Sequence, residues 1–563
     1  YPQIQNSPIS RKKNMSEKLY NGLIIPDQWP PNLNFNGPSE ILPANYVQTK
    51  PEICPIDVGR QLFVDNFLIH ETSMTKTFHQ AIKSEHNPIL SPKTNIELDN
   101  GECPVAAPFN DGVWWDSKDR MFKMWYHSGW MKGTCLATSE DGINWIRPTL
   151  DVVPGTNLVL VNRDGYRRDG CCVWLDHATR NPEERFKMFQ FFRYPNNGEI
   201  GEIYSSADGI HWGDPTPTGV LGDNSTFFYN PFIKKWVYSI RTPKSHSSKL
   251  DPNTRHIRTR SYREHENFFE GSQWNEEDMS MWAWSDYLDL PDPFIGDEPQ
   301  LYDVNANAYE SLMLGLFAIY QGPHNEIAER NGIPKTNDLT VAFSRDGFHW
   351  DRESRQPFIA SERKDGSWDK AYIHAAGGTC LVVGDELYFY YGAWSGISPN
   401  LHGSMIGSHR RANAMYAGGS TGLATLRRDG FASMDSGNTP RVLTTKLVTF
   451  SGQHLYVNCD SSLGALKIEI LDEHGEVLQP FTADKCNVVN IDSTKKQITW
   501  SETDNLSAIR ETKVRFKFYT TNTKLYSFWV SNTPKGESGG YLSAGGPEFE
   551  GIIDCPSEDM FFT

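Results

Sequence analysis

The heptapeptide SEDGINW, residues 139–145, returns as SADGIHW at residues 206–212 and as SRDGFHW at residues 344–350. A shortened copy, RRDGFAS, begins at Arg427. An Asp-Gly pair is typical of a tight turn, in which glycine takes positive φ and aspartate accepts hydrogen bonds from the backbone. The tryptophan that follows predicts packing between neighbouring sheets. We therefore interpret this blade phrase as a structural marker of a repeated unit.

The spacing of the blade phrase predicts how many units the chain contains. Its aspartates are Asp141, Asp208, Asp346 and Asp429, and the interval from Asp208 to Asp346 is about twice the first interval. WAWSDYLDL, residues 282–290, keeps part of the phrase and fills the long interval as a degenerate copy. Internal repetition at such a period is typical of propellers and solenoids, so we expect five units.

Each copy of the phrase follows strands of one kind. VWWDSKDRMFKMWYHSG from Val113 and CLVVGDELYFYYGAW from Cys380 each give an apolar strand, a polar turn and a second strand rich in aromatic residues. In the fourth unit, SLMLGLFAIYQG at residues 311–322 lacks the turn and predicts one long inner strand. This order is that of a propeller blade, and a closed ring of blades removes exposed sheet edges.

The sequence thus predicts an all-β protein, a five-bladed β-propeller followed by a C-terminal β-sandwich. We expect an irregular, proline-rich arm over residues 1–54, the propeller over residues 55–440 and the sandwich over residues 441–563. The sandwich is predicted because the short alternating strands after residue 441 carry no further blade phrase.

Composition limits the partners of the protein. The formal net charge of -16 argues against nucleic acid, whose phosphates require clustered Lys and Arg. No run of apolar residues is long enough to span a bilayer, and the first residues contain no apolar core of a signal peptide. The nine cysteines form no CxxC pair. We therefore expect no metal and no cofactor, and a structural cation in the propeller channel is not indicated.

The layout resembles the glycoside hydrolase superfamily of families 32, 43, 68, 117 and 130, over roughly residues 55–555. In RRDGCCVWLD, Arg168 and Asp169 match the Arg-Asp pair of the second blade of family 32, with Gly170 in place of its proline. A Glu-Cys pair occurs at Glu102 and Cys103, before the first blade and not in the third, and no WMNDPNG occurs. The resemblance implies a bacterial, periplasmic or secreted glycosidase, exo-acting on a plant or algal oligo- or polysaccharide.

Propeller geometry supplies candidate catalytic groups, because the residues just before each inner strand converge on one funnel. Glycosidic cleavage uses one carboxyl group as general acid and a second as nucleophile or base. We expect Glu310 to be the acid, since its apolar flanks would bury it and raise its pKa. Asp169 or Asp223 would be the base or nucleophile, and Glu102 is a further candidate. Each also has a structural interpretation, as a blade hydrogen bond, a salt bridge or a turn cap.

Substrate-binding groups are expected around these carboxylates. Arg168, His374, Tyr302 and Tyr309 can donate hydrogen bonds to a sugar. Trp130 and Trp394 would stack on a sugar ring or pack between blades. The stretch RHIRTRSYREHENFFEG, residues 255–270, is a basic island in an acidic chain. If Arg258 and Arg260 in this island cover the funnel, they predict an anionic sugar, and a solvated surface loop is the alternative.

Two other functions stay open at this stage. A glycoside phosphorylase would use the basic residues of the funnel to hold phosphate as the attacking group. A non-catalytic carbohydrate-binding propeller is the other, since one fold carries many functions. No GxSxG, HExxH or phosphate-binding loop occurs, so serine hydrolases, zinc proteases and nucleotide-dependent enzymes are disfavoured. The oligomeric state is left open.

Overall fold

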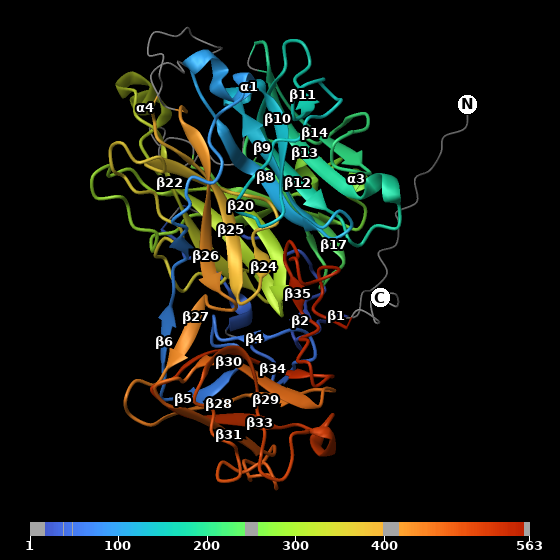
Figure 1. Cartoon of the computed structure of the whole chain (residues 1–563), viewed down its shortest axis with the longest axis vertical. Coiled ribbons are helices and arrows are strands. Elements are labelled where there is room, and N and C mark those ends of the chain that lie inside the picture. The colour runs from blue at the N-terminus through green and yellow to red at the C-terminus, as the bar shows by residue number, and fades with distance from the viewer. Residues whose placement is uncertain are drawn as a thin grey trace.

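The structure is a computed structural model, and it describes residues 17–556 apart from 36, 38, 48, 197, 242–256 and 398–415. The described residues form a ring of five antiparallel sheets with a β-sandwich beneath it (Figure 1). No helix in this described part of the chain is long and apolar enough to cross a membrane. The predicted all-β propeller with a sandwich is confirmed.

The first three blades are each built from four consecutive strands, with the first strand innermost. Blade one contains β8 (Ala106–Asp116), β9 (Met121–Ser128), β10 (Gly133–Ser139) and β11 (Leu158–Val161). Blade two contains β12 (Arg167–Leu175), β13 (Phe186–Tyr194), β14 (Gly198–Ser206) and β15 (Thr216–Pro217). Blade three contains β16 (Thr226–Asn230), β17 (Lys235–Ile240), β18 (Arg260–His265) and β19 (Ser280–Ala283).

The last two blades include strands from distant parts of the chain. Blade four contains β20 (Gln300–Glu310), β21 (Leu312–Gly322) and β22 (Thr336–Ser344), and β35 (Tyr541–Leu542) pairs with the end of β20. Blade five contains β23 (Ala371–Ala375), β24 (Leu381–Val383), β25 (Glu386–Trp394), β26 (Gly419–Arg427) and the N-terminal β7 (Ile82–Lys83). A parallel bridge between Asn110 in β8 and Ala376, directly after β23, joins blades one and five and closes the ring.

The sandwich combines strands from both ends of the chain. One sheet contains β32 (Asp492–Gln497), β30 (His454–Asp460), β34 (Lys524–Ser531), β27 (Ala432–Asp435), β6 (Thr75–Phe78) and β4 (Gln61–Leu62). The other contains β31 (Ala465–Leu471), β33 (Arg515–Thr521), β28 (Arg441–Thr445) and β5 (Ile69–Thr72). β29 (Leu447–Thr449) pairs with β3 (Ile53–Pro55), and β1 (Glu17–Lys18) pairs with β2 (Ile24–Ile25).

The pairing differs from the predicted domain boundaries at both ends. Strands β4, β5 and β6 lie within the range expected for the propeller, yet they pair with sandwich strands. β27 also precedes residue 441 and pairs with β34 in the sandwich. β35 lies in the range expected for the sandwich but extends blade four. Local sequence patterns identify strands, but they do not identify partners hundreds of residues away.

Helices are short and lie in the connections. The α-helices are α1 (Asn95–Leu98), α2 (Gly129–Lys132), α3 (Phe268–Gly271) and α4 (Asn325–Asn331). The 3-10 turns are η1 (Asn45–Val47), η2 (Asp99–Gly101), η3 (Pro182–Glu184), η4 (Glu276–Asp278) and η6 (Ser507–Ile509). We call the propeller end that carries α1 and α4 the outer end, and the opposite end the sandwich side (Figure 1).

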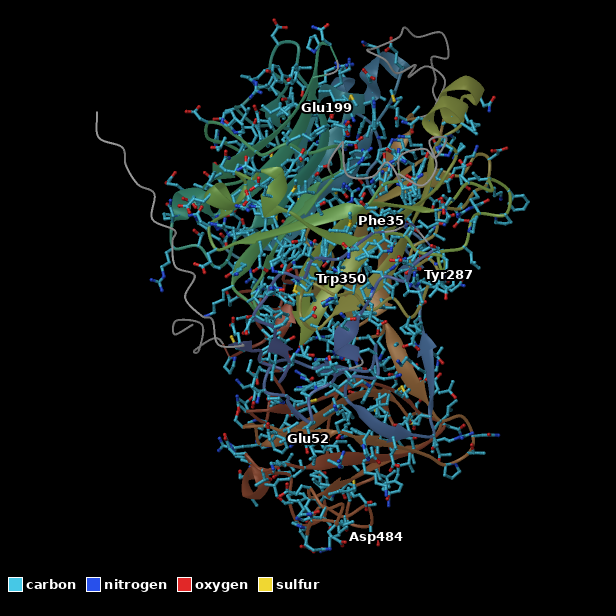
Figure 2. The ribbon with its side chains drawn as sticks, turned by 180° about the vertical axis from the view of Figure 1, so that it is seen from behind. Phe35, Glu52, Glu199, Tyr287, Trp350 and Asp484 are labelled. Atoms are coloured by element: carbon cyan, nitrogen blue, oxygen red, sulfur yellow. The ribbon has the colours of Figure 1, made fainter. Side chains whose placement is uncertain are left out.

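The blade phrase forms the same turn in three blades. Asp141, Asp208 and Asp346 each accept hydrogen bonds from the backbone N–H groups two and three residues later and from a serine hydroxyl. The following glycines have φ of 76°, 78° and 81°, in the left-handed region that favours glycine. Trp350, labelled in Figure 2, packs on Trp282 of blade three and Phe317 of blade four. These turns are structural, as predicted.

Two expectations about the blades were wrong. WAWSDYLDL begins within β19, the fourth strand of blade three, whereas the three full phrases come at the ends of third strands. In blade four the inner strand is β20, and the predicted inner strand over residues 311–322 corresponds to the second strand, β21. Because β20 is the inner strand, Tyr309 and Glu310 lie at its end and not before its start. They are therefore at the sandwich side of the channel and not at its entrance.

Candidate functional site

The inner strands begin at the outer end of the propeller and bring polar side chains together there. Tyr302 and Asp303 lie near the start of β20, and Tyr372 and His374 lie in β23. The hydroxyl groups of Tyr302 and Tyr372 are 2.8 Å apart, and His374 Nδ1 lies 3.2 Å from Asp303 Oδ2. Blades four and five therefore share one polar cluster at the outer end.

Two predicted catalytic carboxylates bind one guanidinium group in the same region. Arg193, at the outer end of β13, donates from Nε to Asp169 over 2.6 Å and from Nη2 to Asp223 over 2.8 Å. Its Nη1 pairs with Glu199, which Figure 2 labels at the outer end, away from the sandwich residues Glu52 and Asp484. Burial lowers the pKa of Arg193, but Asp169 and Glu199 outweigh it and the net shift is upward. Asp169 and Asp223 are thus close neighbours across blades two and three.

Arg168 supports the backbone of Asp169. It is buried, and its Nη1 pairs with Asp111 over 2.8 Å while its Nε and Nη2 donate to the backbone carbonyl of Asp169. Nη1 also donates to Thr134. Every nitrogen of this guanidinium already has a partner, so a role of Arg168 in binding substrate stays a prediction. Its contacts fix the backbone that presents Asp169.

His374 and Asp303 form a buried pair at the centre of the cluster. Both side chains are fully buried. Burial lowers the pKa of His374, and Asp303 opposes that shift only in part, so the ring is neutral near pH 7. With Nδ1 assigned as the donor to Asp303, Nε2 carries the lone pair, and among the described residues it has no hydrogen-bond partner. Such a ring can accept a proton or a hydrogen bond from a ligand.

Positive charge concentrates around this pair. Burial and the neighbouring Arg258 and Arg260 lower the pKa of Arg241 to about 9, although Arg241 also contacts Asp223. Burial, followed by Arg258, Arg241 and Arg193, lowers the pKa of Lys335 well below its ordinary value, against Asp169. These mutual shifts show that the cations lie within electrostatic range of each other. The outer end is therefore basic in an acidic chain.

Aromatic rings line the same cluster. Trp130 stacks on Tyr416 with 4.2 Å between ring centroids and an interplanar angle of 7°. Trp394 packs against Tyr372 and His374 with centroid distances of 5.3 and 5.6 Å. Both tryptophans are buried, with exposed fractions of 2% and 0%. Packing accounts for their positions, and their contact with a sugar ring stays a prediction.

Glu310 and Tyr309 lie at the other end of the channel, so the structure does not bring them together with Asp169 and Asp223. Glu310 is the last residue of β20, and it accepts hydrogen bonds from the backbone N–H of Arg60 at 3.0 Å and from Ser538 at 2.7 Å. It also pairs with Arg428. Tyr309 donates to Asp429 over 2.6 Å. Burial raises the pKa of Glu310 as expected, with Arg428 opposing, but the carboxyl group belongs to the junction with the sandwich.

Glu102 lies where the sequence predicts it, before the first blade, whereas part of the basic island forms a strand and not a loop. Glu102 is half-buried beside η2, just before β8 at the outer end, as predicted. Residues 260–265 of the island form β18 in the body of blade three, so this part is no lid over the funnel. Residues 255 and 256 lie outside the described residues. Arg258 donates to Gln300 over 2.8 Å, and its guanidinium lies over the ring of Tyr320.

Sequence reasoning missed Arg193, Arg241, Lys335, Tyr372 and Tyr416. Arg193 pairs in register with Arg167, one residue before Arg168, so the hairpin partner of a predicted inner strand could have identified it. Arg241 follows the second strand of blade three in the same way. Lys335 directly precedes β22, the third strand of its blade. Arg193, Arg241 and Lys335 therefore lie at the outer ends of second and third strands, whereas Tyr372 lies in the inner strand β23 itself.

Within the described ranges, no group of three or more His, Cys, Asp or Glu residues could hold a metal ion. Comparisons with known proteins find no matching family model and no similar curated protein. Among solved structures, one similar chain is an N-acetylgalactosamine deacetylase from F. plautii in complex with blood group B trisaccharide. It has 12% identity and a TM-score of 0.40 over 63% of this chain and 96% of that chain.

Two further solved structures are similar to this chain at the same level. A thermostable family-43 glycoside hydrolase has 12% identity and a TM-score of 0.36 over 58% of this chain and 92% of that chain. A β-1,2-mannobiose phosphorylase from Listeria innocua has 11% identity and a TM-score of 0.36 over 62% of this chain and 97% of that chain.

Proposed function

We propose that the protein is a glycoside hydrolase whose active site is the polar cluster at the outer end of the propeller. The observation that carries this proposal is the meeting of Asp169 and Asp223 on the guanidinium of Arg193. Glycosidases hold two carboxyl groups about 5 Å apart when they retain configuration and about 6.5–9.5 Å apart when they invert it. Two carboxylates that share one guanidinium are neighbours on this scale.

The contacts of the pair suggest a division of labour. Arg193 donates to the carboxylate of Asp169 over 2.6 Å, and a carboxylate held in place by a cation suits a nucleophile or a general base. Arg168 holds the Asp169 backbone from behind through two hydrogen bonds of 3.0 and 2.9 Å. Asp223 is the second carboxyl group of the reaction. Its side chain is 18% exposed, so a sugar can reach it.

The remaining groups of the cluster would orient the substrate. Tyr302, Tyr372 and His374 can exchange hydrogen bonds with sugar hydroxyl groups, the last through Nε2, which has no partner in the part of the chain that the structure describes. Glu102 stands at the entrance of blade one as a further carboxylate. The proposal includes exo-action on a plant or algal oligosaccharide, a bacterial origin and secretion to the periplasm or beyond. Product analysis tests the exo-action, and cell fractionation tests the location.

A panel of defined oligosaccharides with product analysis tests the proposal. The wild-type chain should release sugar from at least one member, and Asp169→Asn and Asp223→Asn should each lower turnover by roughly two to four orders of magnitude. Azide should restore turnover of an activated glycoside only in the variant that lacks the nucleophile or base. No turnover on the whole panel, or full activity of both variants, would count against a glycosidase.

A glycoside phosphorylase is the second candidate, and the basic cluster favours it. Arg241 and Lys335 lie within electrostatic range of Arg193, which binds Asp169 and Asp223. Cations beside the reacting bond could hold inorganic phosphate as the attacking group. Turnover that requires phosphate and yields a sugar phosphate would select this alternative over hydrolysis.

A further inference from the structure

We propose that the outer end of the propeller binds an oxyanion, with the guanidinium of Arg260 as its principal ligand. The anion is a carboxylate, sulfate or phosphate group. That a sugar carries it rests on the proposed function, whereas the anion site itself rests only on the contacts of Arg260 and its neighbours.

Arg260 is an unusual residue among the buried arginines of this chain. It lies at the outer end of β18 and is 0% exposed. Its Nε, Nη1 and Nη2 have no hydrogen-bond partner among the described residues. By contrast, the buried Arg168, Arg345 and Arg352 each pair with an aspartate within 2.5–2.8 Å. Burying a cation without hydrogen bonds is costly, so this guanidinium is arranged for a ligand.

Asp303, the acidic group that acts on Arg260, forms no hydrogen bond with it. Asp303 acts on Arg260 at a distance and opposes the effect of burial on its pKa, which still falls to about 10. The hydrogen bond of Asp303 goes to His374 instead. Its other oxygen, Oδ1, has no partner in the described part of the chain. Asp303 therefore offsets part of the charge of Arg260 and leaves all its donors available.

Neighbouring cations add to the attraction for an anion. Arg258 lowers the pKa of Arg260, and Arg258 and Arg260 both lower the pKa of Arg241. Arg258 and Arg241 also lower the pKa of Lys335. Each of these groups would be relieved of repulsion by a negative charge placed among them. An oxyanion is the ligand that this arrangement favours.

The geometry of guanidinium limits the chemistry of the ligand. Its planar fork of donors matches the paired oxygens of a carboxylate, a sulfate or a phosphate. Lys335 also lies within electrostatic range of Asp169, so the anion site and the carboxylate pair belong to one cluster. The anion is then either a substituent of the bound sugar, as in a uronic acid or a sulfated unit, or free phosphate.

Binding to the full chain tests this proposal without requiring turnover. The probes are glucuronate, sodium sulfate and sodium phosphate, with glucose and sodium chloride at equal ionic strength as references. We expect at least one anion to raise the melting temperature of the wild type progressively with its concentration, by about 2–4 °C once the anion is in excess. Arg260→Met should lose this rise, and Arg180→Met, at an exposed position, should keep it.

The variants also separate an anion site from a structural ion pair. Without an anion, Arg260→Met should melt at the same temperature as the wild type or above it, because a repelled buried cation has been removed. If Arg260 were instead a structural partner of Asp303, the substitution would lower the melting temperature. If Arg260→Met does not fold, Arg258→Met replaces it in the test. Its affinity for the anion, measured by calorimetry, should be at least tenfold lower than that of the wild type.

Different outcomes identify the source of the anion or overturn the site. Binding of glucuronate or sulfate indicates a substituent of the sugar, and binding of phosphate alone indicates a phosphate co-substrate. Anion binding in a protein without turnover would leave the site in place and remove the proposed function. No anion-dependent rise in the wild type, or an equal rise in Arg260→Met, would overturn the site.

Discussion

Glu310 and Arg428 form a buried ion pair on the sandwich side of the propeller, with 3.1 Å between Oε1 and Nη2. Arg428 also reaches Asp554, near the C-terminal end of the described chain. The pair therefore joins the innermost strand of blade four to residues that follow the sandwich strands. A carboxyl group that looks catalytic from its apolar flanks serves here to hold two parts of the protein together.

Glu310→Gln should destabilise the protein and leave its chemistry intact. Gln keeps the size of the side chain but loses the charge that faces Arg428 and Arg60. Breaking a buried charged contact of this kind should lower the free energy of unfolding by about 1–4 kcal/mol, measured by urea titration. Glu550→Gln, at an exposed position, is the control and should change stability little. If Glu310→Gln were as stable as the wild type, the ion pair between Glu310 and Arg428 would not hold the two parts of the protein together.

Arg193→Met should act on activity through the two aspartates. Without the guanidinium, the negative charges of Asp169 and Asp223 repel each other, and a proton on one of them relieves this repulsion. The acid limb of the pH–rate profile should therefore move to higher pH, and Arg193→Lys should restore part of the wild-type profile. A uniform loss of activity at all pH values would indicate that Arg193 is only structural.

Asp351 provides a pH-dependent test of the packing beside β22. Burial, with the nearby Asp65 and Glu353, raises the pKa of Asp351 from 3.8 to about 6. The folded state thus binds this proton more tightly than the unfolded state. Stability from protonated Asp351 is present below about pH 4 and is lost as the pH rises through about 6.

Asp351→Asn should therefore be more stable than the wild type at pH 8, by about 1–3 kcal/mol, and should show little gain at pH 4. Urea denaturation of both proteins at the two pH values measures the difference. The comparison between variant and wild type cancels the titration of all other acids. An equal change in stability at pH 4 and pH 8 would refute the raised pKa.

Asp208→Ala should disturb a blade turn without affecting catalysis. Asp208 Oδ1 accepts hydrogen bonds of 2.8 and 2.9 Å from the backbone N–H groups of Ile210 and His211. Losing these contacts should lower the free energy of unfolding by about 1 kcal/mol. Turnover per folded molecule should equal that of the wild type. A large loss of turnover would place the blade phrase in the reaction.

The sequence predicts the parts of this fold that depend on local patterns. The Asp-Gly turns at Asp141, Asp208 and Asp346 mark blades one, two and four, and the short alternating strands without a blade phrase after residue 441 indicate the sandwich. Partners far apart in the chain were missed. β7 completes blade five, and β4 to β6 join the sandwich, because sheet pairing between distant segments leaves no local signal.

The sequence predicts a site residue correctly where it predicts the inner strand that carries this residue. Asp169, Tyr302 and His374 lie at the outer end because β12, β20 and β23 begin there. The sequence misplaces Glu310 because SLMLGLFAIYQG, which is more apolar than the strand before it, predicts the inner strand, whereas that position belongs to β20. Arg193 reaches Asp169 from the second strand of its blade, a contact that depends on hairpin register and not on the pattern of any one strand.

Turnover of Asp169→Asn and Glu310→Gln on one active oligosaccharide, each expressed per folded molecule, tests most directly that the chemistry lies at the outer end. The proposed site predicts a loss of at least a hundredfold for Asp169→Asn and turnover close to wild type for Glu310→Gln. Turnover of Asp169→Asn close to that of the wild type, together with a loss of at least a hundredfold for Glu310→Gln, would contradict the account.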